Sequence, residues 1–227
     1  MPKTPADAAA AAPVTPFQEF LREHDPAMEM RIPLPGPVDP ILRDLARAVR
    51  ETPQSERGHA CHDGTWSSIC LAVGSGWGAS RPAPRLASMP AVSALLDRFG
   101  GCAGFCTLAR IAPGDLLDWH VDPLSADGGI ARLHLPVVTN PGAVTDLCHR
   151  RVHWPVGTLH YGDYGFPHRV FNTGATERIH LYFDVSSEAI AQLLDPELCQ
   201  PRHDLRARST GLMHRYRGRD TRISSPP

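Results

Sequence analysis

A series of short segments rich in branched and aromatic residues, beginning near Cys102, limits the possible folds of this chain more than any other feature. Turn-forming stretches such as APGD (112–115), ADGG (126–129) and TNPG (139–142) separate them. Short strands at this regular spacing are typical of antiparallel sandwiches and barrels. We therefore predict a jelly-roll-like β core over residues 102–186, with strands in 103–111, 115–121, 131–139, 150–155, 157–163, 168–174 and 178–185.

Three segments have the spacing of amphipathic helices. Residues 38–51 carry apolar side chains at helical intervals after Asp39-Pro40, a start that fits a cap followed by proline at the first helical position. Residues 88–99 repeat the pattern, with Ser88 as the expected cap, and residues 186–194 form a third segment of this kind. Helices packed outside a β core give an α+β fold.

The length of 227 residues suits one domain with a sizeable core. We expect residues 1–16 to be a disordered tail, residues 17–199 to be a single domain, and residues 200–227 to be an arginine-rich extension. That extension has seven arginines between Arg202 and Arg222. It could wrap the domain or remain disordered, and a solvated tail is the commoner explanation for such a composition than an acidic partner.

Composition argues against nucleic acid and membrane partners. The net charge is −1 and the isoelectric point is near 6.9, so no overall field favours nucleic acid. No stretch approaches the roughly 18 consecutive apolar residues of a membrane span, and the N-terminal segment lacks the apolar run of a secretory signal. Six cysteines without a CxxC pair are expected to be reduced, which together with these features predicts a cytoplasmic protein.

The stretch DWHVDP (118–123) places His120 and Asp122 two positions apart. In an extended strand these two side chains point to one face, while Trp119 and Val121 point to the other. The arrangement suits two ligands of one metal ion, and it equally suits an ordinary hydrogen bond between a histidine and a carboxylate. Trp119 is expected to pack in the core.

A third metal ligand has to come from another strand, and His168 lies at the start of one. Arg178 follows ten residues later, beyond the turn NTGATE (172–177). A hairpin joining 168–172 to 178–184 would place Arg178 on the strand next to His168. Two histidines and a carboxylate leave coordination positions open, as in non-haem Fe(II) oxygenases, and a guanidinium can bind a carboxylate through two hydrogen bonds.

The segment from His120 to Asp184 resembles the 2-oxoglutarate-dependent aspartyl/asparaginyl β-hydroxylase family, and within it the bacterial proline hydroxylase-like members. The motifs that carry the resemblance are WHVDP (119–123), RLHLPVVTNPG (132–142), WPVGTLHYGD (154–163), FPHRVFN (166–172) and RIHLYFDV (178–185). The resemblance implies a double-stranded β-helix that binds Fe(II) through His120, Asp122 and His168. It also implies that 2-oxoglutarate chelates the metal and pairs its far carboxylate with Arg178. Because it retains Asp122, the chain resembles the bacterial small-molecule enzymes more than the animal protein hydroxylases or the halogenases.

Arg132 and His134 alternate with leucines in RLHLPV, so they share one face of a strand. An unpaired buried charge is costly, and carboxylates arriving with the substrates would satisfy both residues. The resemblance implies that His134 contacts 2-oxoglutarate near the metal and that Arg132 contacts a carboxylate of the substrate or cosubstrate. The alternative for Arg132 is an internal salt bridge, for example with Asp127. Three further histidines are expected to be structural: His153, His160 and His180.

The predicted function is hydroxylation of an unactivated C–H bond in a small molecule. The enzyme would bind Fe(II) as its cofactor, consume 2-oxoglutarate and O₂, and release succinate and CO₂. The expected substrate is an amino acid, with proline the nearest precedent, or an amino-acid derivative such as a carrier-tethered or peptide intermediate. Alternatives are a non-catalytic metal-binding sensor, an isomerase or hydrolase on the same barrel, and desaturation or cyclisation at the same iron. The glycine-rich stretch 74–80 is predicted to be a loop that covers the site.

Overall fold

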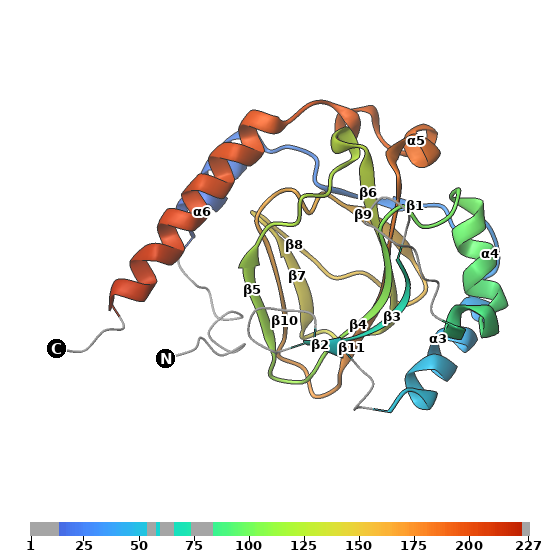
Figure 1. Cartoon of the computed structure of the whole chain (residues 1–227). Coiled ribbons are helices and arrows are strands. Elements are labelled where there is room, and N and C mark those ends of the chain that lie inside the picture. The colour runs from blue at the N-terminus through green and yellow to red at the C-terminus, as the bar shows by residue number, and fades with distance from the viewer. Residues whose placement is uncertain (1–13, 54–57, 60–65, 74–83, 224–227) are drawn as a thin grey trace.

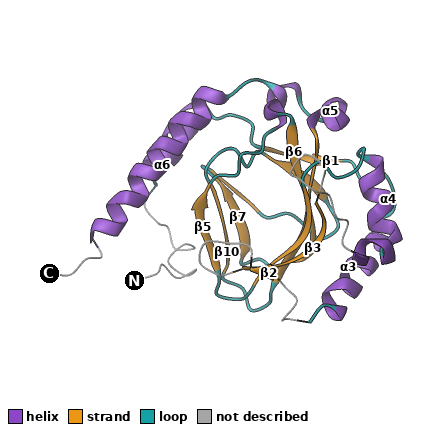
Figure 2. Cartoon of the chain, viewed as in Figure 1, coloured by secondary structure: helices purple, strands orange, loops and turns teal. Residues whose placement is uncertain are grey.

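The computed structural model describes residues 14–53, 58–59, 66–73 and 84–223, whose strands form two antiparallel sheets that face each other (Figures 1 and 2). The larger sheet has the order β1-β9-β6-β11-β4-β3-β2 and the smaller sheet the order β5-β10-β7-β8. This is the predicted double-stranded β-helix, and the predicted α+β class is confirmed. The larger sheet consists of β1 (Glu29–Ile32), β2 (Gly58–His59), β3 (Trp66–Val73), β4 (Phe105–Ile111), β6 (Ile130–Val138), β9 (Leu159–Gly162) and β11 (Arg178–Ser186). The smaller sheet consists of β5 (Leu116–His120), β7 (Ala143–Leu147), β8 (Arg150–Val152) and β10 (His168–Asn172).

The strands of the larger sheet separate an apolar outer face from a polar inner face. On β6, Leu133 and Leu135 are fully buried in the main hydrophobic cluster, whereas Arg132 and His134 line the space between the sheets. The period of two that strand geometry imposes produces this division. Each fully buried leucine stabilises the fold by roughly 1.5–3 kcal/mol, so a one-residue slip of β6 would be costly.

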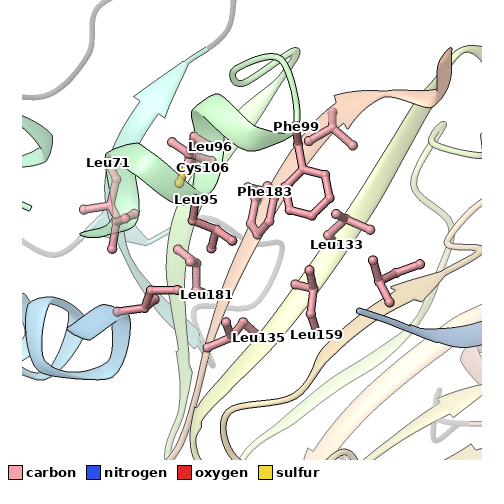
Figure 3. Packing of buried hydrophobic residues seen from close by; sticks show 14 of the residues in the cluster. Leu71, Leu95, Leu96, Phe99, Cys106, Leu133, Leu135, Leu159, Leu181 and Phe183 are labelled. Atoms are coloured by element: carbon pink, nitrogen blue, oxygen red, sulfur yellow. The ribbon is translucent and has the colours of Figure 1, made fainter. Parts of the chain in front are cut away.

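Two helices cover the outer face of the larger sheet, α3 (Asp39–Glu51) and α4 (Pro90–Arg98) (Figure 1). Leu95, Leu96 and Phe99 pack there against Leu181 and Phe183 of β11 (Figure 3). The predicted helices at 38–51 and 88–99 are thereby confirmed, although the N-caps are Val38 and Met89 and neither side chain makes a capping hydrogen bond. A 3₁₀ turn, η3 (Pro84–Ser88), precedes α4.

The termini of the described chain pack together beside the smaller sheet. α2 (Pro16–His24) lies along α6 (His203–Ile223), and Phe17 and Met213 share a buried cluster with Trp119 (Figure 1). The arginine-rich extension, for which the sequence left wrapping or disorder open, therefore forms a helix that packs on the domain. Most of the expected N-terminal tail, residues 1–13, lies outside the described residues, as does the predicted covering loop 74–80.

After β11 the chain forms α5 (Ser187–Ile190), two 3₁₀ turns, η5 (Ala191–Leu193) and η6 (Pro196–Cys199), and then α6. The third predicted helix, 186–194, is thus present as α5 and η5. A further 3₁₀ turn, η4 (Ala126–Gly128), joins the β5 region to β6. Among the described residues, every helix is too short or too polar to span a lipid bilayer.

The predicted hairpin between residues 168–172 and 178–184 is wrong. β10 belongs to the smaller sheet and β11 to the larger sheet, so the turn between them crosses from one sheet to the other. Asn172 holds this turn, because its side-chain amide donates to the carbonyl of Thr176 at 2.8 Å and its Oδ1 accepts from the Gly174 N–H at 3.1 Å. Arg178 therefore lies on the sheet opposite His168, not on the adjacent strand.

Candidate metal centre

Three side chains that could hold a metal ion meet at the edge of the smaller sheet. They are His120 at the end of β5, Asp122 two residues later and His168 at the start of β10, and their ligand atoms all lie within 4.8 Å of one another. Antiparallel pairing aligns His168 with His120, so their ring centroids are 4.1 Å apart. The structure thus brings together the three predicted ligands in a two-histidine, one-carboxylate arrangement that suits non-haem iron.

Backbone carbonyls orient both imidazole rings. Nδ1 of His120 lies 2.7 Å from the Asp118 carbonyl, and Nδ1 of His168 lies 3.0 Å from the Phe166 carbonyl. Because a carbonyl oxygen only accepts, each Nδ1 carries the hydrogen, and Nε2 is the nitrogen that can bind a metal. Burial, aided by the neighbouring His120, lowers the pKa of His168 to about 3, so this ring is neutral at pH 7.

Tyr164, in the turn after β9, supports two of the three candidate ligands. Its carbonyl oxygen accepts a hydrogen bond from the Asp122 N–H at 2.9 Å. Its ring meets that of His168 edge-on, with the centroids 4.7 Å apart. The sequence did not single out Tyr164, because YGDYG (161–165) has no feature that separates a packing tyrosine from one in a site.

A cavity of about 490 Å³ between the two sheets contains the triad. This volume lies within the roughly 300–1,000 Å³ that is usual for small-molecule sites. Besides the triad and the charged or aromatic groups described below, its walls are mainly apolar, with a few small polar side chains. They are Ser68, Cys70, Phe105, Thr107, Ala109, Ile111, Leu117, Pro123, Leu124 and Tyr182.

Arg178 lines the same cavity from the opposite sheet and has an unbalanced charge. Its side chain is buried, at 3% exposure, and its Nη2 donates to Oγ1 of Thr145 on β7 at 3.3 Å. No carboxylate among the described residues forms an ion pair with it. Burial lowers its pKa to about 10. A buried cation without a counterion is costly, and a ligand carboxylate would offset that cost.

His134 and Tyr164 add two further unsatisfied groups to the cavity. Both ring nitrogens of His134 and the Tyr164 hydroxyl are buried and make no hydrogen bond to the described residues. The two rings lie close, with centroids 4.8 Å apart. Burial, and then the charge of Arg178, lowers the pKa of His134 well below its usual value, so the ring is neutral. The carboxylate oxygens of a ligand could accept hydrogen bonds from the protonated ring nitrogen of His134, from the Tyr164 hydroxyl and from Arg178.

Arg132 is already paired within the protein. Its Nε donates to Oδ1 of Asp184 at 2.7 Å, and its Nη1 donates to Oδ2 of Asp122 at 2.6 Å. The structure therefore contains an internal salt bridge, as the alternative held, but with these two partners. Asp127 instead pairs with Arg206 at 2.6 Å. The contact of Arg132 with a substrate carboxylate stays a prediction.

The remaining histidines and Trp119 lie mostly as expected. His153 Nδ1 is 3.0 Å from the Ala143 carbonyl, and His160 Nε2 is 2.8 Å from Oγ1 of Thr158. Nδ1 of His180, like Nδ1 of His160, is buried and has no hydrogen-bond partner among the described residues. Trp119 is 3% exposed in a hydrophobic cluster, which agrees with the core-packing role.

Comparison with known proteins identifies the family. The sequence model of the aspartyl/asparaginyl β-hydroxylase family matches residues 39–188. This match covers more than half of the chain, so the chain belongs to that family. The curated proteins include no match to it.

One solved structure shows the same fold at low sequence identity, and two others are similar at lower TM-scores. A 2-oxoglutarate–Fe(II) oxygenase-family oxidoreductase from Burkholderia pseudomallei is 15% identical, with a TM-score of 0.50 over 75% of this chain and 88% of its own. A prolyl-4-hydroxylase from Pseudomonas putida is 18% identical, with a TM-score of 0.46 over 75% and 98%. HygX from Streptomyces hygroscopicus, solved with nickel and 2-oxoglutarate, is 9% identical, with a TM-score of 0.47 over 74% and 86%.

Family and fold agree on the class of the protein. It is an enzyme of the 2-oxoglutarate-dependent oxygenase class, as predicted, and the cofactors of that class are Fe(II) and 2-oxoglutarate. The donor set fits this pair, because two imidazole nitrogens and one carboxylate suit iron, while the buried Arg178 suits the free carboxylate of the ketoacid.

Proposed function

We propose that this protein hydroxylates an unactivated C–H bond of an amino acid or an amino-acid-derived small molecule, with release of succinate and CO₂. His120, Asp122 and His168 would hold the iron. Arg178 and His134 would hold 2-oxoglutarate, and Tyr164 joins them in this role. Assignment to the branch of small-molecule amino-acid hydroxylases is part of the proposal.

One observation supports the proposal above the others. Arg178 is a buried, uncompensated cation that faces the same cavity as the two-histidine, one-carboxylate triad. A metal-binding sensor would need the triad but would gain nothing from such a cation, whose burial costs free energy. A dicarboxylic cosubstrate that chelates the metal accounts for both features with one molecule.

The residues of the cavity would orient the reactants and exclude water. When bound, iron and 2-oxoglutarate would activate O₂, the oxidant, for attack on the C–H bond. Arg178 would fix one end of the ketoacid, and the neutral His134 and the Tyr164 hydroxyl would donate hydrogen bonds to it. Ile111 and Leu117, which line the cavity and belong to one apolar cluster, would shield the site from water.

The proposal is tested by measuring O₂ uptake and succinate release with Fe(II), 2-oxoglutarate and a panel of amino acids and their amide or peptide derivatives. We expect succinate release to require Fe(II), 2-oxoglutarate and O₂, and to increase when the substrate is added. Metal binding without succinate would favour the sensor. Product formed without O₂ and 2-oxoglutarate would favour an isomerase. An unsaturated or cyclised product would support the iron centre but would show that it catalyses desaturation or cyclisation instead of hydroxylation.

A further inference from the structure

A chain of two carboxylates and one arginine leads from the candidate ligand Asp122, which is partly exposed, to Asp184 in the protein interior. The fully buried Asp184 accepts two hydrogen bonds from Arg132, from Nε at 2.7 Å and from Nη2 at 3.0 Å. The third nitrogen, Nη1, donates to the candidate ligand Asp122 at 2.6 Å. The ring of Tyr182 lies 4.4 Å below the guanidinium and packs against its face. Arg132 is therefore held on three sides.

Asp184 is itself held in a fixed position. Its Oδ2 accepts a hydrogen bond from the Phe105 N–H at 3.0 Å, and its carbonyl accepts one from the Ala103 N–H at 2.7 Å. Gly104, between these residues, lies against the carboxylate so closely that a Cβ at that position would be 2.6 Å from Oδ2. A side chain at residue 104 would therefore displace Asp184 without altering any charge.

We propose that Asp184 is a positioning residue for the iron ligand Asp122 and acts through Arg132. The inference rests on the proposed function, since it requires a metal at the triad. Two physical effects support it. The guanidinium of Arg132 binds both carboxylates, so the fixed position of Asp184 restricts the position of the Asp122 carboxylate. The negative charge of Asp184 also balances Arg132, so that a divalent cation does not meet an uncompensated positive charge nearby.

This role changes the reading of Arg132. Two of its three nitrogens bind Asp184 and the third binds Asp122, which uses three of the five guanidinium N–H groups and leaves at most two for a substrate carboxylate. Arg132 would then serve mainly the metal ligand, and its predicted contact with a substrate carboxylate would be limited to the two remaining N–H groups.

The experiment uses the full chain freed of metal and titrated with Co(II) alone, with affinity read from the visible absorption of the bound ion. Asp184→Asn should raise the Kd for Co(II) about 10–100-fold, the range for loss of an outer-shell partner. Gly104→Ala, which keeps every charge, should raise the Kd in the same direction. The matched control is Asp146→Asn, because Asp146 is a buried carboxylate that accepts from Nε of Arg169 at 2.8 Å but does not line the cavity.

Thermal unfolding of the metal-free variants separates metal affinity from loss of fold. Lowered Co(II) affinity in a folded Asp184→Asn protein, with the wild-type Kd in Asp146→Asn, supports the inference. If Asp184→Asn does not fold, Gly104→Ala decides. A wild-type Kd in the Asp184 and Gly104 variants, or an equal loss in the control, overturns it. A wild-type protein that does not bind Co(II) overturns the metal centre itself, a result distinct from failure of this inference.

Discussion

Replacement of Arg178 by methionine tests the cosubstrate site most directly, because the structure predicts effects of opposite sign on binding and on stability. Arg178 is 3% exposed and has no carboxylate partner among the described residues. Truncating one partner of a buried charge pair costs about 2–5 kcal/mol. At about 1.36 kcal/mol per tenfold change, this cost corresponds to an increase in the Kd for 2-oxoglutarate of between about 30-fold and several thousand-fold.

The stability of the protein without ligand should respond differently. With no counterion present, Arg178 contributes the cost of a buried charge, and methionine fills a similar volume without that cost. We therefore expect the midpoint of thermal unfolding of the ligand-free Arg178→Met protein to be equal to or higher than that of the wild type. Stabilisation by added 2-oxoglutarate, which follows from preferential binding to the folded state, should be largely lost.

Binding can be measured by equilibrium dialysis of labelled 2-oxoglutarate against the Mn(II)-loaded protein, and the KM can be measured from succinate release. Arg110→Met is the matched control, because Arg110 lies on the neighbouring β4, pairs with Glu177 at 2.5 Å and does not line the cavity. An Arg178→Met protein that is strongly destabilised without ligand, yet binds 2-oxoglutarate as the wild type does, would refute the reasoning and make Arg178 a structural residue.

Three further changes address the metal and its surroundings. Asp122→Ala should abolish substrate hydroxylation while the protein still unfolds cooperatively; full activity would show that the ligand set is wrong. Tyr164→Phe should raise the KM for 2-oxoglutarate about 10–100-fold, since a hydrogen bond to a charged group contributes about 1.5–3 kcal/mol; an unchanged KM in the succinate assay would restrict Tyr164 to packing. Treatment with a chelator should abolish succinate release, and Fe(II) but not Mg²⁺ should restore it; activity that survives chelation would exclude an iron centre.

Much of the β core could be predicted from the sequence, because its strands are rich in branched and aromatic residues and end at strong turn signals. β7 was not predicted as a strand, because AVTDL (143–147) has no aromatic residue and contains alanine and aspartate, which are uncommon in strands. The N-terminal β1 and β3 join the larger sheet as well. Their place in the sheet depends on pairing with β9 and β4, which no local pattern reveals.

The crossing between β10 and β11 shows a second limit of local signals. A short turn between two strands usually makes a hairpin, and residues 173–177 have the composition of one. Here the turn links two sheets, because β11 pairs with β4 and β6 while β10 pairs with β5 and β7. The prediction that Arg178 lies near His168 was nevertheless useful, since two facing sheets can bring side chains together as adjacent strands do.

The candidate site was predicted where a pattern within one strand or the family resemblance indicated it, as for His120, Asp122, His168 and Arg178. Asp184 and Tyr164 were not predicted, because their roles arise from contacts between distant elements. Asp184 meets Arg132 across the β6–β11 pair, where the two residues are register partners. A carboxylate at the end of RIHLYFDV has no local feature that distinguishes it from a surface aspartate.

The site is divided between the two sheets, and this division makes binding depend on how the sheets pack. The candidate metal ligands His120 and His168 are on the smaller sheet, whereas Arg178, His134 and Arg132 are on the larger one. A cosubstrate that chelates the metal and reaches Arg178 must therefore bridge the sheets. The Arg132–Asp122 contact and the Arg178–Thr145 hydrogen bond already connect them without ligand. Iron and 2-oxoglutarate should thus stabilise the sandwich jointly, each raising the affinity for the other, because each favours the same spacing of the two sheets.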